Sequence, residues 1–139
     1  QHALVLHSDD GLDEISIAAL TRGFELKAGD LSPIEIDPAI LGHAHDTLDG
    51  LQVETVADSA RLIRAALEGD DDVASIKARS IIALNAGAGI YVSGVTESLA
   101  SGIAAAEQAI ASGAAIQKLE AFVAFTQDLP EQQGGAPTS

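Results

Sequence analysis

An apolar run that leads directly into an acidic turn limits the folds open to this sequence. Ala3–Leu6 is a continuous aliphatic stretch, and His7–Ser16 follows it with a glycine and two adjacent carboxylates, Asp13 and Glu14. A short apolar run of this kind predicts a strand covered on both faces. In α/β proteins, ligands often bind where such a strand ends in a Gly-containing turn. The sequence therefore predicts an α/β fold with a candidate site at residues 13 and 14.

Alternating residues predict two further strands joined as a hairpin. Gly23–Leu26 and Ile34–Ile36 alternate with a period of two, and Lys27–Asp30 between them has the composition of a turn. Pro38 ends the extended region. Residues 38–54 show no period, which predicts a long loop. We expect a short mixed sheet.

Four helices are expected to follow the sheet. The period becomes helical at Thr55, and Gly69 supplies a stop for the first helix. The second helix is expected over Val73–Val92, where Gly87 and Gly89 interrupt the pattern. Glycine in a helix interior costs about 1 kcal/mol relative to alanine. Two such residues therefore indicate close packing against a neighbouring element.

The third and fourth helices complete the expected fold. The third is predicted to run from a cap at Thr96 to Ser112, and the fourth from Ala114 to about Phe125. Residues 128–139 are polar and rich in Gly and Pro, which predicts a disordered tail after a single unit over residues 1–127. Four side chains of the last helix are expected to face inward: Ile116, Leu119, Phe122 and Val123.

Composition argues against several classes of function. The chain carries 21 acidic and 7 basic residues, for a net charge of −14. This charge repels nucleic acid, because affinity for it comes mainly from Lys and Arg. The absence of Cys excludes disulfides, thiolate metal sites and a Cys nucleophile. No apolar run has the length of a membrane span. We expect a cytoplasmic protein whose handling of any phosphate would need a divalent cation or an additional basic segment.

Asp13 and Glu14 are the candidate metal ligands. Mg²⁺ typically takes one or two carboxylates together with the phosphates of a substrate. An adjacent acidic pair is, however, more often a solvated turn or a helix start, so the pair alone leaves both interpretations open. His43 and His45 lack a third ligand at a recognisable spacing, and His7 ends a strand, so the roles of the three histidines also stay open.

Glycine-rich and nucleophile motifs give no second site. Gly89–Thr96 has the length of a phosphate-binding P-loop, but Val95 stands where the motif requires Lys. The segment also falls in or after a predicted helix, whereas the motif follows a strand. No Gly-x-Ser-x-Gly elbow is present. We predict no catalytic nucleophile in this chain.

Two motifs together carry a resemblance to a known family. His7–Ser16 contains Gly-Leu-Asp-Glu, and Ala83–Gly94 contains Leu-Asn-Ala. With the hairpin and Ser98–Glu107 in the same order, residues 1 to about 127 resemble the anthranilate phosphoribosyltransferase family. The resemblance implies a larger α/β domain beside a small helical domain, with this chain as the C-terminal part of the former.

The resemblance also implies an activity and a cofactor. Members of the family transfer a phosphoribosyl group from phosphoribosyl pyrophosphate to anthranilate, releasing pyrophosphate, in tryptophan biosynthesis. In the family pattern the Asp-Glu pair binds Mg²⁺, so Asp13 and Glu14 would hold Mg²⁺ on the leaving pyrophosphate. The family's phosphate loop, its anthranilate-binding Arg and its homodimer helices would precede residue 1. We therefore expect this segment alone to be inactive.

Two alternatives remain open from the sequence. A relative of the pyrimidine nucleoside phosphorylases would share the architecture, with phosphate in place of pyrophosphate. A family-like binding protein without catalytic activity would need a ligand surface such as a basic groove for nucleic acid, and the net charge of −14 argues against such a groove.

Overall fold

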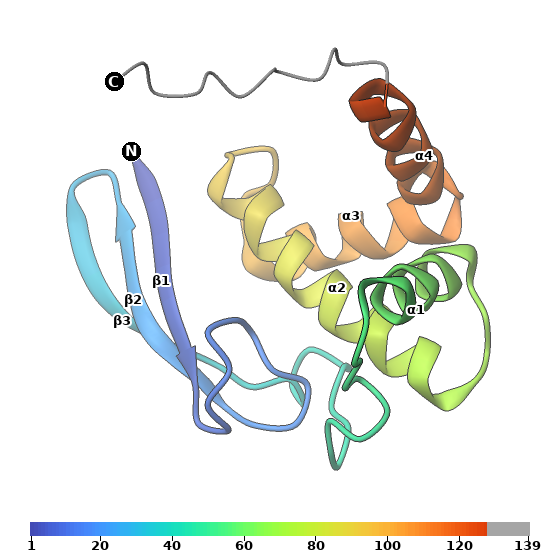
Figure 1. Ribbon diagram of the computed structural model, residues 1–139. Helices are drawn as coiled ribbons and strands as arrows, with labels where there is room; N and C mark the ends of the chain where they lie inside the picture. Colours follow the sequence, from blue (N-terminus) through green and yellow to red (C-terminus); the bar gives the residue numbers. More distant parts are fainter. Residues whose placement is uncertain (128–139) are drawn as a thin grey trace, which may run out of the picture.

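The computed structural model describes residues 1–127 as a three-stranded sheet followed by four helices (Figure 1). The predicted tail, residues 128–139, lies outside the described residues. The α/β class, the hairpin and the four helices are confirmed. The elements are β1 (His2–Ser8), β2 (Thr21–Lys27), β3 (Asp30–Ile36), α1 (Val56–Glu68), α2 (Val73–Val92), α3 (Leu99–Ala111) and α4 (Ala114–Gln127).

The three strands pair in the order β1-β2-β3, and both pairs are antiparallel. We expected a mixed sheet, but these strands include no parallel pair. Parallel neighbours need a crossover connection, usually a helix. Residues 9–20 instead form an irregular loop that returns the chain beside β1, and the β2–β3 hairpin turns at Ala28 and Gly29, both with positive φ.

Only one face of the sheet packs against the core. Leu4 and Leu6 of β1 point toward the core, whereas Val5 between them is 71% exposed. Across the sheet, Phe24 lies opposite Val5 and is 53% exposed. The four helices lie on the other side of the sheet (Figure 1). The prediction that this strand is covered on both faces is therefore wrong for residues 1–127.

The apolar interior consists of two clusters that share α2. The first joins the loop after β1 to the sheet, α2 and α3, and its buried members are Ile15, Ile17, Ile36, Leu84, Ala88 and Ile103. The second lies where α1, α2, α3 and α4 meet and is built on Leu67, Ala83 and Ile110. Residues on different sides of α2 thus tie the sheet and the terminal helices to one central element.

Two glycines allow α2 and α3 to cross in close contact. A Cβ atom added to Gly87 would lie 2.5 Å from Ile103 Cγ1 and 2.6 Å from its Cα, and one added to Gly102 would lie 2.3 Å from the Gly87 carbonyl oxygen. The close packing expected from the glycines of α2 is thus confirmed at Gly87. Gly89 has open space around its Cα and makes no such contact.

The start of α3 and the packing of α4 differ from the predictions. Ser98, rather than Thr96, is the N-cap of α3, because its hydroxyl accepts from the Ser101 amide in a capping box. In α4, Ile116 and Leu119 pack on the second cluster, but Phe122 is 62% exposed and no residue of the helix is fully buried. The inward prediction for Phe122 is wrong because, among the described elements, α4 contacts α1 and α3 along one side and leaves Phe122 exposed.

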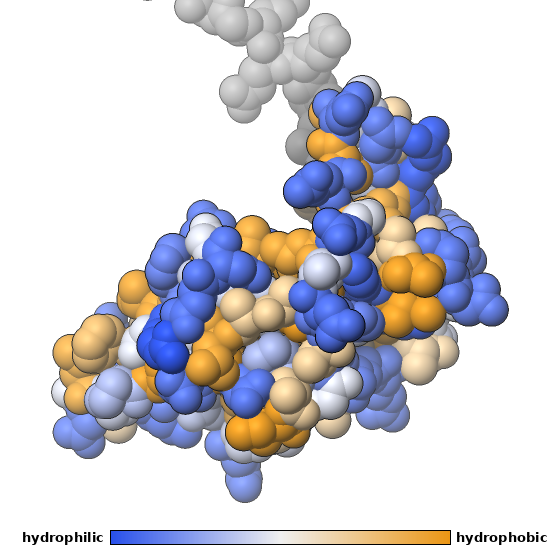
Figure 2. Space-filling view, turned by 90° about the horizontal axis from the view of Figure 1, so that it is seen from below, coloured by the Kyte–Doolittle hydropathy of each residue, from blue (hydrophilic) through white to orange (hydrophobic). Residues whose placement is uncertain are grey.

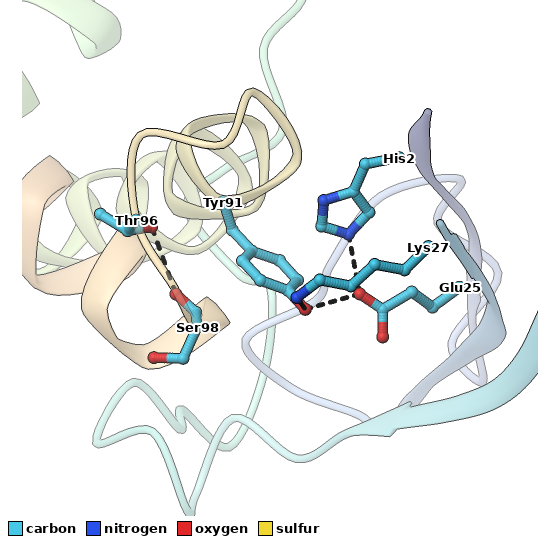
Figure 3. Close-up of polar contacts among 6 residues, drawn as sticks. All are labelled: His2, Glu25, Lys27, Tyr91, Thr96 and Ser98. Carbon is cyan, nitrogen blue, oxygen red and sulfur yellow. Dashed lines mark hydrogen bonds and ion pairs between the residues drawn. The ribbon is translucent and has the colours of Figure 1, made fainter. Parts of the chain in front are cut away.

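A polar cluster joins α2 to the end of the sheet where β1 begins and β2 ends (Figure 3). Tyr91 donates its hydroxyl to Glu25 at 2.6 Å and accepts from Lys27 at 3.0 Å. His2 lies 2.7 Å from the same Glu25 oxygen and packs edge-on against the Tyr91 ring. These hydrogen bonds, above all that from Tyr91, lower the pKa of Glu25. The cluster thereby fixes the strands against the last turn of α2.

On the face drawn in Figure 2, hydrophilic side chains alternate with groups of exposed apolar ones. Exposed large apolar residues include Leu31, Ile40 and Val56. Within residues 1–127 no single helix is long and apolar enough to cross a membrane, although α3 and α4 would pass that test as one unit bent by 73°.

The two α2 glycines provide a matched test of the helix crossing. Gly87→Ala is expected to destabilise the chain by about 1–3 kcal/mol, because the added methyl overlaps Ile103 in a well-packed contact. Gly89→Ala should instead stabilise it by up to about 1 kcal/mol, since alanine is the better helix former and meets nothing. Urea unfolding measures both changes, and equal effects from the two variants would contradict the close crossing.

Candidate functional site

The acidic turn lies in the irregular loop that connects β1 to β2. It begins where the Ser8 amide donates to the Leu12 carbonyl at 2.9 Å and the Gly11 amide donates to the Ser8 carbonyl at 3.0 Å. Gly11 has φ +94°, a conformation that glycine adopts without strain. This tight reversal turns the chain away from the sheet and presents residues 13 and 14 at the surface.

The four acids of the loop divide into two pairs with different surroundings. Asp9 forms an ion pair with Arg22, and Asp10 accepts a hydrogen bond from the Ser16 hydroxyl. Asp13 and Glu14 are exposed, and neither carboxylate has a hydrogen bond or ion pair within residues 1–127. The first two acids therefore stabilise the loop, while the second two keep their oxygens available for a cation.

Glu14 stands at the rim of a shallow groove of about 200 Å³ between the loop and helices α1 and α2. The lining is mostly apolar and includes Leu51, Ile63 and Ile81. Partial burial there, followed by the negative charge of Asp13, raises the pKa of Glu14. Two carboxylates that repel each other in this way form a site that a bound cation would relieve.

The residues directly after the acidic pair are anchored in the core. Ile15, Ser16 and Ile17 are fully buried. The Ile15 amide donates to Asn85 Oδ1 at 2.9 Å, and Asn85 Nδ2 donates to the Ile15 carbonyl at 2.9 Å. Sequence reasoning missed this contact. The available signal was a single amide side chain on an otherwise apolar face of the predicted helix.

The three histidines considered as ligands lie away from the acidic pair. His7 is exposed on the open face of the sheet, opposite Arg22. His43 is buried beside Glu107, with 3.4 Å between Nε2 and Oε1, in a cavity of about 490 Å³. His45 Nε2 lies 3.2 Å from the Ser80 hydroxyl. None of the three histidines is placed next to residues 13 and 14.

The acidic pair fits a cation that takes few protein ligands. No group of three or more His, Asp or Glu residues that could hold a metal occurs in the part of the chain that the structure describes. Mg²⁺ retains several waters and is commonly held by one or two carboxylates plus substrate phosphates. Asp13 and Glu14 could hold Mg²⁺ in this way, whereas a metal that requires a full set of protein ligands does not suit them.

The family of the chain follows from comparison with known proteins. The profile described as "Glycosyl transferase family, a/b domain" matches residues 1–116. The chain belongs to this family. The match spans the sheet, the acidic turn and α1 to α3, so the candidate site lies inside the family's α/β domain.

Two similar relatives of this glycosyl transferase family member have the same name. The anthranilate phosphoribosyltransferase of Teredinibacter turnerae is 47% identical over 126 residues, which are 91% of this chain and 37% of the relative. That of Acinetobacter baumannii is 42% identical over 133 residues, 96% of this chain and 38% of the relative. The resemblance seen in the sequence is confirmed. The chain spans little more than a third of the length of these relatives.

Solved structures of the same enzyme share the fold. Anthranilate phosphoribosyltransferase from Thermus thermophilus matches with a TM-score of 0.76 and 32% identity, over 91% of this chain and 36% of that chain. The enzyme from Saccharomyces cerevisiae, solved in complex with phosphoribosyl pyrophosphate and Mg, matches with a TM-score of 0.65 and 22% identity. This match covers 91% of this chain and 35% of the yeast chain.

The raised pKa of Glu14 predicts how stability depends on pH. Folding favours the protonated carboxyl, so its stabilising contribution is present below the ordinary value of 4.5 and is lost as pH rises through the raised folded-state pKa. Glu14→Gln should therefore be more stable than the unaltered chain at pH 7. Its advantage should disappear below pH 4.5.

Urea unfolding over a pH series measures this difference, and Asp13→Asn is the matched variant. Removing the neighbouring charge should lower the pKa of Glu14, which a carbon-detected NMR titration of its carboxyl reports directly. A Glu14 pKa at or below its ordinary value in the unaltered chain would contradict the described environment.

Proposed function

We propose that this chain is the part of an anthranilate phosphoribosyltransferase that carries the metal-binding turn. The intact enzyme would transfer a phosphoribosyl group from phosphoribosyl pyrophosphate to anthranilate and release pyrophosphate. The observation that carries the proposal is the exposed Asp13–Glu14 pair, which has no hydrogen bond or ion pair within residues 1–127, in a chain 47% identical to a protein of that name. The resemblance carried by the Gly-Leu-Asp-Glu and Leu-Asn-Ala motifs supports the same activity.

In this proposal Asp13 and Glu14 hold Mg²⁺ by their carboxylate oxygens. The bound cation would neutralise charge that develops on the pyrophosphate as its bond to the ribose breaks. The chain's own contribution is to keep two negative charges adjacent and unpaired at a fixed place on the surface. Asp9 and Asp10 assist by engaging Arg22 and Ser16, which holds the loop without using the acidic pair.

The net charge supports the proposal that this chain holds the metal while other parts of the enzyme bind the phosphates. A chain with a net charge of −14 repels phosphates unless cations offset it. Metal at Asp13 and Glu14 would supply part of that offset. Basic residues for phosphate and the pocket for anthranilate would come from the rest of the length found in the relatives, together with the contacts of a homodimer.

The first test removes each carboxylate from the enzyme that carries this chain. Asp13→Asn and Glu14→Gln should each lower kcat by about 100-fold or more, since a catalytic metal contributes several kcal/mol to the transition state. The assay follows loss of anthranilate fluorescence at saturating Mg²⁺ and phosphoribosyl pyrophosphate. Glu97→Gln, an exposed acid in the α2–α3 connection, is the matched control and should keep full activity.

The second test concerns the chain by itself. A preparation whose intact mass matches these 139 residues should show no Mg²⁺-dependent transfer, because it offers two metal ligands and no pocket assigned to either substrate. Turnover by such a preparation would contradict the proposal that other parts of the enzyme bind the phosphates. Full activity of both carboxylate variants in the complete enzyme would overturn the proposed role of the turn.

A further inference from the structure

We propose that Asn85 is the positioning residue of the Asp13–Glu14 turn, and this inference rests on the proposed function of that turn. Asn85 lies in the middle of α2, 70 positions from Ile15 along the chain. Its side-chain amide receives a hydrogen bond from the backbone of Ile15 and returns another, both 2.9 Å long. This reciprocal contact fixes the peptide units that directly follow Glu14.

Asn85 holds the backbone of Ile15 through two hydrogen bonds. Its Oδ1 accepts from the Ile15 amide, which belongs to the peptide unit that Glu14 and Ile15 share, and its Nδ2 donates to the Ile15 carbonyl. Two hydrogen bonds to one residue restrict both its translation and its rotation. Because the Glu14 Cα lies in the plane of this peptide unit, the place at which the Glu14 side chain leaves the backbone is restricted as well.

Asn85 is itself held in one orientation by its own helix. Its Nδ2 also donates to the Ile81 carbonyl at 3.0 Å, so both hydrogens of the amide are engaged. This bond defines which atom is oxygen and which is nitrogen, since only the nitrogen can donate to two carbonyls. The orientation of the Asn85 amide is thus fixed by a contact within α2, independently of the loop.

Further hydrogen bonds hold the two residues that follow Ile15. Ser16 donates from its amide to the Thr21 hydroxyl at 3.1 Å, and the His45 amide donates to the Ile17 carbonyl at 2.8 Å. Within residues 1–127, Asn85 is the residue that hydrogen-bonds to the peptide unit between Glu14 and Ile15. Ligand-orienting partners of this kind typically alter metal affinity by about 10–100-fold when they are removed.

Substitution at Asn85 separates positioning from general stability. Alanine is the stronger helix former, so Asn85→Ala keeps the helical tendency of α2 and removes the amide, which leaves the Ile15 amide and carbonyl without this partner. Asn85→Asp keeps an acceptor for the Ile15 amide but loses the donor and places a carboxylate against two carbonyls. Ile110→Ala, in the second apolar cluster, is the control that lowers stability far from the turn.

Two NMR measurements on the 139-residue chain test the inference. The first is amide hydrogen exchange without metal, in which Asn85→Ala should speed exchange at residues 13–17 selectively, while Ile110→Ala should affect the core amides together. The second is a titration with Mn²⁺ alone, read as line broadening near Asp13 and Glu14. Asn85→Ala and Asn85→Asp should raise the Mn²⁺ dissociation constant by about 10-fold or more, and Ile110→Ala should leave it unchanged.

The outcomes distinguish this inference from the proposed function. Unchanged exchange at Ile15, or an unchanged Mn²⁺ dissociation constant, in the Asn85 variants would overturn the positioning role. An unaltered chain that shows no broadening near Asp13 and Glu14 would count against the metal role itself. The exchange measurement, made without metal, still reports in that case whether Asn85 fixes the turn.

Discussion

Close contact between α2 and α3 is the constraint on which the other contacts of the chain depend. Gly87 and Gly102 remove the side chains that would hold the two helices apart, so Ile103 lies against the backbone of α2. With α3 in that place, the first cluster can close over Ile15 and Ile17. Overlap at this crossing would displace both the interior and the loop that it supports, because protein cores are packed too tightly to absorb an added methyl group locally.

Elements with local signals could be predicted from the sequence, and contacts between distant residues could not. The bounds of α2 match the prediction because its signals are local: the apolar residues lie in the helix itself, Asp72 directly precedes it and Ser93 directly follows it. Exposure of Val5 depends on which elements cover the sheet, and a single strand's composition does not reveal that. Exposure of Phe122 has the same origin, since helical periodicity alone does not say how many neighbours a helix has.

The candidate site shows the same division. Adjacency of Asp13 and Glu14 is a property of the sequence, and their placement after a strand followed from the apolar run. The sequence did not reveal which acids of the loop already have partners. The folded structure shows that Asp9 pairs with Arg22 and that Asp10 accepts a hydrogen bond from Ser16. Anchoring by Asn85 spans 70 positions, so neither motif predicts it from its own residues, although both motifs contribute to the resemblance.

The position of α4 affects where local unfolding of the chain can begin. Within residues 1–127, this helix has no fully buried residue and packs on the second cluster, whereas Ile15 and Ile17 join the acidic turn to the first. Segments with few buried contacts exchange with solvent by local opening at little cost in free energy. Fraying can therefore begin at α4 while the loop between β1 and β2 keeps its shape, so that local order at the turn does not depend on the integrity of α4.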